Sequence, residues 1–527
     1  MPDLPSSAPL SPHGHPRVNP WIVATAVMLS TFLEVLDTSV VNVSLPHIAG
    51  SLSATVDEAT WVLTSYLVAN AIVLPITGWL ANQFGRKRLL MIAVSLFTLA
   101  SFLCGIAPTL PLLITFRIIQ GASGGCLQPI SQAVLLETFP PDQRGKAMAF
   151  WGMGIVVAPI LGPTLGGWLT YAYSWRWVFY INLPIGIASL IMTQLYLFDP
   201  SYIKPGKGKV DFWGLGLLAV GISAMQIMLD RGQEDDWFGS HFIILLAIVA
   251  VGGLVAFVIR ELWARDPIVH LRVFKNRTYA TGVLLMTLLG FILYGSLVIL
   301  PLFLQTLLNY TSLAAGIWTS PRGLGSLIFM PITGILLSRR WDARRLLAVG
   351  FITAGGALYA FSLFNLNSGT WNIFWPQLIQ GAGMAFVFVP LTTVTMDPVP
   401  NHEMGNATSL FNLMRNLGGS MGISFATTLV ARRAQFHQQR LDASLNVYSP
   451  RVRQALRRTQ LLVQHAGASP SVAHGQALAM LYGGLRQQAS LLSYLDGFYL
   501  FAIIFFCMVP LIWLMRRPKA GRAVSAH

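Results

Sequence analysis

Apolar runs long enough to cross a bilayer recur along the whole chain and are separated by short polar segments. A helical span needs about 20 apolar residues, so each run predicts a transmembrane helix. Fourteen runs meet this description, at 21–46, 60–81, 89–107, 111–136, 147–170, 177–197, 212–229, 241–259, 280–307, 313–337, 346–364, 372–395, 405–431 and 496–515. The pattern therefore predicts an all-α integral membrane protein with fourteen spans.

Composition and charge support this interpretation. The 527 residues are 54% hydrophobic and only 10% charged. A soluble protein typically has about 25% charged residues, so this composition favours a membrane protein. Most of the 35 basic residues fall in alternate short loops and in the tails, so the positive-inside rule predicts that both termini are cytoplasmic. The net charge of +15 is spread over these loops, and we therefore do not expect binding to nucleic acid.

The cysteines and the apparent enzyme motifs do not indicate a disulfide, a metal site or a catalytic site. Cys104, Cys126 and Cys507 lie in apolar runs, which favours packing over a disulfide or metal site. Two G-x-S-x-G sequences, Gly121–Gly125 and Gly418–Gly422, also lie in apolar runs and fit G-x-x-x-G helix packing better than a nucleophile elbow. With no phosphate-cradling loop to use ATP either, we expect neither an enzyme nor a cofactor.

An internal repeat divides the chain. Arg117–Ala122 is echoed by Gln377–Ala382, and the run that starts at Gly78 is echoed at Gly334 by nearly the same offset. Duplicated six-helix halves are typical of transporters that bind substrate between the halves. The predicted organisation is a disordered cytoplasmic tail (1–20), a six-helix bundle (21–197), two inserted spans with their loops (198–278), a second six-helix bundle (279–515) and a cytoplasmic tail (516–527).

Glu34 and Asp37 stand near the middle of the first span, three residues apart and so on one helical face. Each carboxylate there costs about 2.5 to 3.5 kcal/mol on insertion scales, which points to function. Arg117 in the fourth span keeps its proton and is the natural partner of one of them. Burial favours the protonated carboxyl and a nearby cation favours the carboxylate, so a moving Arg117 would make an acid bind and release a proton. A static salt bridge is the alternative.

Three motifs resemble those of the major facilitator superfamily. Gly78–Arg88 is similar to its loop signature between the second and third spans, Arg117–Gly121 to its fourth-span motif and Gly162–Gly167 to its fifth-span antiporter motif. Asn82 replaces the usual aspartate of the loop signature, so a charge relay through that position is not expected.

Further motifs resemble one branch of that superfamily, the fourteen-span drug:proton antiporters. Leu36–Pro46 is similar to the first-span motif of this branch. Gln226–Gly232 with Asp236–Phe238, and Trp375–Gly381, look like its EmrB type. The resemblance implies a multi-pass exporter of the bacterial inner membrane that uses a proton gradient to expel hydrophobic or amphipathic drugs. A proton-linked transporter of a polar metabolite, and a scaffold or sensor that keeps the fold without transport, are the alternatives.

The resemblance and the residue chemistry together give candidate site residues. Asp37 is the expected coupling acid beside Arg117, whereas Glu34 lies outside the motif and is expected to meet cationic drugs. The expected gating residues are Gly78, Gly85, Arg86, Arg88, Gly162, Pro163, Gly166 and Gly167. Polar and soft residues expected at a substrate cavity are Asn42, Gln128, Tyr294, Gln305, Asn412, Met414 and Arg415. Arg415 is expected to pair with Asp397 or to stay hydrated.

Residues 432–495 form an external segment with arginines and apolar residues at helical spacing. Such a segment lies on the membrane lipid, docks a partner or packs on itself as a cap. The EmrB-type resemblance implies a periplasmic EmrA-type adaptor that leads to a TolC-type outer-membrane channel.

Overall fold

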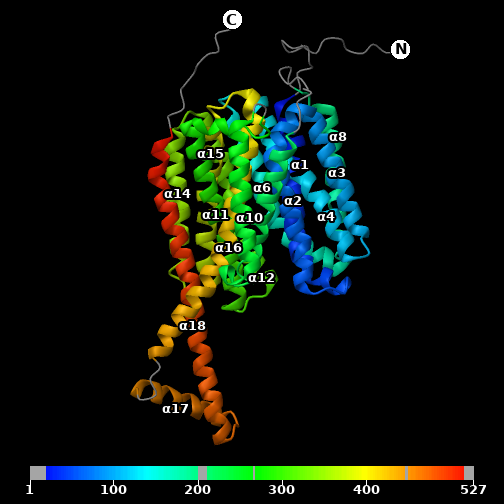
Figure 1. Ribbon diagram of the computed structural model, residues 1–527. Helices are drawn as coiled ribbons and strands as arrows, with labels where there is room; N and C mark the ends of the chain where they lie inside the picture. Colours follow the sequence, from blue (N-terminus) through cyan, green and yellow to red (C-terminus); the bar gives the residue numbers. More distant parts are fainter. Residues whose placement is uncertain (1–18, 200–210, 265–266, 445–448, 516–527) are drawn as a thin grey trace, which may run out of the picture.

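The computed structural model describes residues 19–199, 211–264, 267–444 and 449–515. Its regular elements are all helices, and most run side by side in one bundle, with Pro20 and Met515 at the same end (Figure 1). The predicted tails 1–20 and 516–527 lie outside the described residues, apart from Asn19 and Pro20. The all-α fold predicted from the apolar runs is confirmed.

The helices form two halves with an inserted pair between them. The first half contains α1 (Pro20–Ser51), α2 (Val56–Phe84), α3 (Arg86–Ile106), α4 (Leu110–Gly124), α5 (Leu127–Thr138), α6 (Arg144–Ala172), α7 (Trp177–Tyr180) and α8 (Asn182–Tyr196). The inserted pair is α9 (Phe212–Arg231) and α10 (His241–Trp263), with the 3-10 turns η1 (Trp237–Gly239) and η2 (Leu271–Lys275). The second half contains α11 (Arg277–Thr306), α12 (Ser312–Thr319), α13 (Pro321–Ser338), α14 (Ala343–Phe361), α15 (Thr370–Met396), η3 (Asn401–Glu403), α16 (Met404–Ser444), α17 (Pro450–His465), α18 (Pro470–Leu511) and η4 (Ile512–Leu514).

Each of the fourteen predicted spans coincides with one helix or with two successive helices. Twelve of these fourteen spans are helical segments of the described residues that are long and apolar enough to cross a membrane, and three of the twelve join two successive helices. The other two spans, at α14 and α16, fall short on composition: Arg344 and Arg345 open α14, and α16 carries polar side chains that are buried against other helices, Thr408, Ser409, Asn412 and Arg415. The helices are therefore confirmed, and the count of fourteen spans stays a prediction.

Glycine contacts show that the sequence repeat is a structural repeat. Gly121 of α4 lies against the carbonyl of Tyr66 in α2, and Gly381 of α15 lies in the same way against the carbonyl of Arg322 in α13. A Cβ at Gly78 would lie 2.6 Å from the Asn406 backbone across the halves, and one at Gly334 would lie 3.0 Å from the Gly145 carbonyl. Small residues thus let corresponding helix pairs meet at backbone distance.

The two G-x-S-x-G sequences also serve packing. A Cβ at Gly125 would stand 2.6 Å from the Asn70 carbonyl, while Gly418 and Gly422 lie against the carbonyls of Thr287 and Phe291. The packing interpretation is confirmed.

The outer parts of α16 and α18, together with α17, form an arm that projects from the bundle at the end opposite Pro20 and Met515 (Figure 1). Arg433 and His437 both contact the Asp496 carboxylate at the base of the arm, with distances of 2.5 and 2.7 Å. Farther out, Gln438 donates a hydrogen bond to the Tyr482 hydroxyl at 2.7 Å. The arm packs on itself but points away from the bundle, so it does not cap the bundle.

Candidate functional site

Helix α1 places both acids in the interior of the first half. The Asn19 side chain accepts a hydrogen bond from the Trp21 amide and Pro20 fixes the first turn, so α1 starts without unsatisfied amides at its tip. It continues through Glu34 and Asp37, which are 5% and 0% exposed. Burial of this degree demands polar partners for each carboxyl group.

The Asp37 carboxylate accepts three side-chain hydrogen bonds. Arg117 Nη1 lies 2.5 Å from Oδ2, while Gln120 Nε2 and Asn182 Nδ2 lie 2.9 and 2.7 Å from Oδ1. Asn182 in turn donates to the Ser101 hydroxyl at 3.0 Å. Donors from α4 and α8 thus converge on one carboxylate of α1, and the choice of Asp37 over Glu34 as the partner of Arg117 agrees with this geometry.

Arg117 is held by α2 as well as by Asp37. Its Nε donates to the Val62 carbonyl at 3.1 Å, and its guanidinium carbon lies 4.1 Å from the centre of the Tyr66 ring. Nη1 also donates to Gln120 Oε1 at 2.9 Å. Nη2 is buried without a hydrogen-bond partner, so the cation has donor capacity left inside the bundle.

Glu34 has a separate environment. Asn70 Nδ2 donates to its Oε1 at 3.0 Å, and its Oε2 is buried without a hydrogen-bond partner. Gln128 and Arg415 also face it, the latter from the second half of the protein. The two acids, one helical turn apart, therefore connect to different parts of the fold.

Side chains of α5 and α16 join the two halves. Arg415 Nη2 donates to Gln128 Oε1, and Asn412 Nδ2 donates to Gln132 Oε1 at 2.6 Å. Thr408 adds a bond to the Pro129 carbonyl at 3.1 Å. The expected pairing of Arg415 with Asp397 is wrong, because Arg415 points into this interface.

Asp397 lies just beyond the end of α15 and faces Arg144 instead. Burial raises the pKa of the Asp397 carboxyl, and the positive charge of Arg144 partly opposes that shift. The two groups lie at the end of the bundle where α6 begins and α15 ends.

The other expected cavity residues do not gather in one place. Tyr294 is partly buried against Gly419, and Met414 packs against the main hydrophobic core. Gln305 is partly buried near the opposite end of α11 from Arg277, and Asn42 is exposed. The proposed cavity lining thus stays a prediction for all seven residues, of which Gln128, Asn412 and Arg415 lie where the halves meet.

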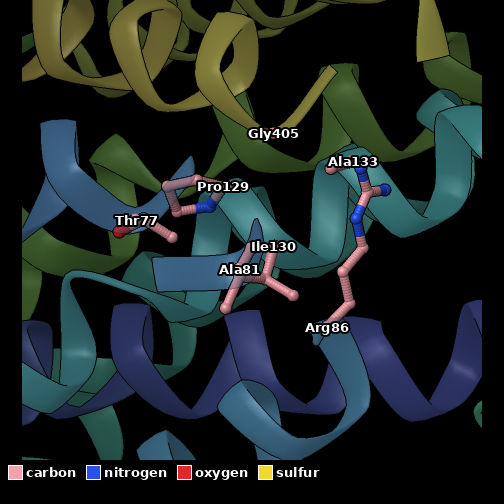
Figure 2. A pocket seen from close by; sticks show the side chains of 7 residues that line it. All are labelled: Thr77, Ala81, Arg86, Pro129, Ile130, Ala133 and Gly405. Atoms are coloured by element: carbon pink, nitrogen blue, oxygen red, sulfur yellow. The ribbon is translucent and has the colours of Figure 1, made fainter. Parts of the chain in front are cut away.

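Figure 2 shows a pocket between α2, the start of α3, α5 and the start of α16, which leaves essentially no room for even a water molecule. Its lining residues are Thr77, Ala81, Arg86, Pro129, Ile130, Ala133 and Gly405. A drug-sized ligand fills about 300 Å³ or more, so this pocket is a gap in the closed interface rather than a drug site.

The glycines of the 162–167 motif bring α6 against α1. Gly162 lies on Ser39, and a Cβ at Gly166 would stand 2.7 Å from the Val40 carbonyl. Gly167 faces away, with its nearest neighbour, Val43, at 4.0 Å. Pro163 is accommodated within α6, which runs unbroken from Arg144 to Ala172.

A sequence profile of the Major Facilitator Superfamily matches residues 27–423. The chain belongs to the major facilitator superfamily. Among its relatives, the multidrug export protein EmrB of Haemophilus influenzae is 40% identical over 498 residues, covering 94% of this chain and 96% of that protein. EmrB of Escherichia coli K12 is 38% identical, with 96% and 98% covered, and the fatty acid resistance protein FarB of Neisseria gonorrhoeae is 40% identical, with 94% and 96% covered.

These identities place the chain in the EmrB-type branch. Solved structures of the superfamily share the fold: the human organic anion transporter MFSD10 gives a TM-score of 0.62 at 13% identity, covering 94% of this chain and all of that one. The proton:xylose symporter XylE gives 0.60 at 15% identity, with 95% and 96% covered. The protein is therefore a multi-pass membrane transporter and not an enzyme.

The residues of the superfamily loop signature make specific contacts with neighbouring helices and loops. Gly85 has a φ of +83° and ends α2, which lets Asp199 approach and accept a hydrogen bond from the Lys87 amide at 2.8 Å. Arg86 is 2% exposed and forms an ion pair with Glu137 of α5, whereas Arg88 and Asn82 are exposed. No carboxylate stands at the exposed Asn82, where the superfamily signature has an aspartate. Two carboxylates from elsewhere in the chain contact the loop instead: Asp199 binds the Lys87 amide and Glu137 binds Arg86.

Sequence reasoning missed several residues around the superfamily's fourth-span arginine. Gln120, Asn182 and Asn70 all donate to the two acids, and Tyr66 covers Arg117. A usable signal was present: each amide is a polar residue inside an apolar run, and Gln120 follows Arg117 by one helical turn.

Proposed function

We propose that the protein is a proton-coupled multidrug exporter of the bacterial inner membrane that exchanges protons for hydrophobic or amphipathic drugs. The Asp37–Arg117 pair carries this proposal, because a fully buried carboxylate with its counter-cation on a neighbouring helix is a group whose proton occupancy depends on helix position. The names of the EmrB relatives support drug export over uptake of a polar metabolite. No cofactor is needed, since the proton gradient supplies the energy.

The coupling follows from the hydrogen bonds of Asp37. As a carboxylate it accepts bonds from Arg117, Gln120 and Asn182 and ties α1 to α4 and α8. A proton on Asp37 removes its charge and turns one acceptor into a donor, which weakens the bond to Arg117. Arg117 then keeps the Val62 carbonyl, Gln120 and the Tyr66 ring, so α1 is released while α4 stays attached to α2.

Glu34 is proposed as the acid that recognises cationic drugs. Its Oε2 has no hydrogen-bond partner, and it faces the interface where Gln128 meets Arg415. A cationic ligand would satisfy this oxygen with a charge-assisted interaction. Asn42, Tyr294, Gln305, Asn412 and Met414 are proposed to join this surface when the halves move.

The gate is proposed to work through backbone contacts between helices. Gly78 packs against Asn406 across the halves, and Gly85 and Arg86 anchor the adjoining loop. Gly162 and Gly166, with Pro163 between them, let α6 lie on the part of α1 that follows Asp37. Motion of α1 on protonation would therefore shift both the α1–α6 contact and the contact between Gly78 and Asn406.

Exchange in proteoliposomes tests the proposal. Purified protein is reconstituted, a pH gradient is imposed, and uptake or efflux of ethidium, a fluorescent lipophilic cation, is recorded together with proton flux. We expect the wild type to exchange the two, Asp37→Asn to lose coupled exchange, and Asp442→Asn, which removes an exposed carboxylate of the arm, to match the wild type. Wild-type rates in Asp37→Asn would overturn the coupling site.

The arm is proposed to bind a periplasmic adaptor of the EmrA type that leads to a TolC-type outer-membrane channel. Its tip exposes apolar side chains that a solvated helix does not need, with Leu462, Leu478 and Met480 exposed by 70%, 48% and 60%. It also stands clear of the bundle, where a second protein can reach it (Figure 1).

A further inference from the structure

The EmrB-type motif at Gln226–Gly232 and Asp236–Phe238 has no part in the site described so far. It forms the last turns of α9 and the adjoining η1, at the turn of the inserted hairpin that lies away from Phe212 and Trp263. Its side chains touch both halves of the transporter, and each set of contacts can be followed residue by residue.

On one side the motif holds α2 of the first half. The Thr64 hydroxyl donates a hydrogen bond to Asp230 Oδ2, and the Arg231 guanidinium lies 5.8 Å from the centre of the Trp61 ring. Thr64 is buried, so its hydroxyl needs a partner at this position.

On the other side the motif holds α16 of the second half. Ser420 donates to Gln226 Oε1 at 3.0 Å, and Trp237 Nε1 donates to the Thr428 hydroxyl at 3.0 Å. The hairpin thus bridges α2 and α16, two helices that belong to different halves.

The bridged stretch of α2 is also the stretch that holds Arg117. Val62 and Tyr66, which contact the guanidinium, flank Thr64 two residues away on either side. Residues two apart on a helix point in nearly opposite directions, so Thr64 faces α9 while Val62 and Tyr66 face α4. Gly121 of α4 lies directly on the Tyr66 carbonyl. Helix α2 is therefore clamped between α9 and α4 at the level of the proton site.

We propose that the inserted hairpin is a brace between the halves and that Asp230 is a positioning residue, which through Thr64 and α2 keeps Arg117 against Asp37. The inference rests on the proposed proton-coupled exchange.

The proposal predicts a shifted pH profile. Besides Arg117, the titratable groups that face Asp37 are Glu34 of α1, Tyr66 of α2 and Cys104 of α3, while α8 offers the neutral Asn182. A loosened α2 moves the one cation among them away from the carboxylate. The carboxylate then lacks its counter-cation, and the midpoint of the exchange rate against pH is expected to move upward by about half a pH unit or more.

The experiment measures ethidium–proton exchange against pH in proteoliposomes for Asp230→Ala, Thr64→Val and the double variant. Both single variants should shift the midpoint upward, and the double variant should shift it no further, because both remove the same bond. Thr64→Ser keeps the hydroxyl and should restore the wild-type profile. Glu234→Gln removes an exposed carboxylate from the same turn and should change nothing.

Two results would overturn the brace. If Asp230→Ala and Thr64→Val only lower the amount of folded protein and keep the wild-type midpoint, the bond is structural. If the two shifts add in the double variant, they do not arise from one contact. Failure of the proposed function looks different, because then the wild type itself exchanges no protons for ethidium and the inference falls with it.

Discussion

Gly162 of α6 lies directly on Ser39 of α1, so that a Cβ at Gly162 would overlap the Ser39 side chain and press on its backbone. Ser39 is two residues beyond Asp37. The glycine motif and the proton site, which are more than a hundred residues apart in the sequence, are therefore neighbours across one helix–helix contact. A change in the position of α1 must be transmitted to α6 at this point, because Gly162 has no side chain that could move aside.

Gly162→Ala is expected to slow exchange and to destabilise the protein. The added methyl group must push α1 from α6, and overpacking of this kind costs about 1–3 kcal/mol. Gly167→Ala is the matched control, since its nearest neighbour would be 4.0 Å away. Thermal unfolding in detergent and ethidium exchange measure the two effects. Equal behaviour of the two alanine variants would contradict the role of the Ser39 contact.

Glu34→Gln is expected to separate drug recognition from coupling. The glutamine oxygen can still accept the Asn70 hydrogen bond, so the fold around it persists, but the negative charge is gone. Exchange of the cation ethidium should fall about ten-fold or more, because a charge pair in a shielded site is lost, while exchange of the neutral drug chloramphenicol should persist. If both drugs are lost together, Glu34 belongs to the coupling machinery with Asp37.

Gln128→Ala is expected to weaken the closed contact between the halves. It leaves the buried Arg415 without its bond across the interface, and a hydrogen bond to a charged group contributes about 1.5–3 kcal/mol, or roughly 10- to 100-fold in population. The opening of this contact can be measured with Ala133→Cys in a variant that lacks the native cysteines. Ala133 lines the pocket between α5 and α16 (Figure 2), so a cysteine there becomes accessible when the halves separate.

A hydrophilic maleimide should label Ala133→Cys faster when Gln128 is replaced. Gln377→Ala serves as the control, since Gln377 is a buried glutamine within the second half. Labelling that is equally slow in both backgrounds would show that the Gln128–Arg415 contact does not hold the halves together.

The fold was readable from the sequence because the bilayer imposes one period and one length on every span. Each apolar run coincides with described helices, and the repeat that contains Gly121 and Gly381 predicted duplicated halves, whose equivalent helix packing the structure then showed. Composition alone fails for α16, whose polar residues face other helices rather than lipid. Hydropathy measures the average of a segment and not the direction of its side chains.

The site was readable only in part. Asp37 and Arg117 stand out because an isolated charge in an apolar run needs a partner, and few candidates exist. The partner of Arg415 did not stand out, because neutral Gln128 serves where an acid such as Asp397 was expected. Asn182 and Asn70 did not stand out either, because side-chain amides are common in helix contacts. Their role is visible only from their partners, the carboxylates of Asp37 and Glu34.

The arm offers the last prediction. Leu478→Arg with Met480→Arg places a charge on each of two exposed sides of α18 without touching the buried Ala473 and Ala477. If the arm binds an adaptor, capture of a purified EmrA-type protein by the reconstituted transporter should fall about ten-fold or more, because charges at the centre of an apolar interface are not compensated.

The same double variant should still exchange ethidium for protons in proteoliposomes, where no adaptor is present, because the arm projects from one end of the helical bundle (Figure 1). Arg451→Gln, on the exposed polar side of α17, controls for a general change in arm charge. Undiminished capture by the double arginine variant would remove docking through this surface. Loss of exchange without any adaptor would instead mean that the arm acts on transport through its continuous helices α16 and α18, which enter the bundle directly from it.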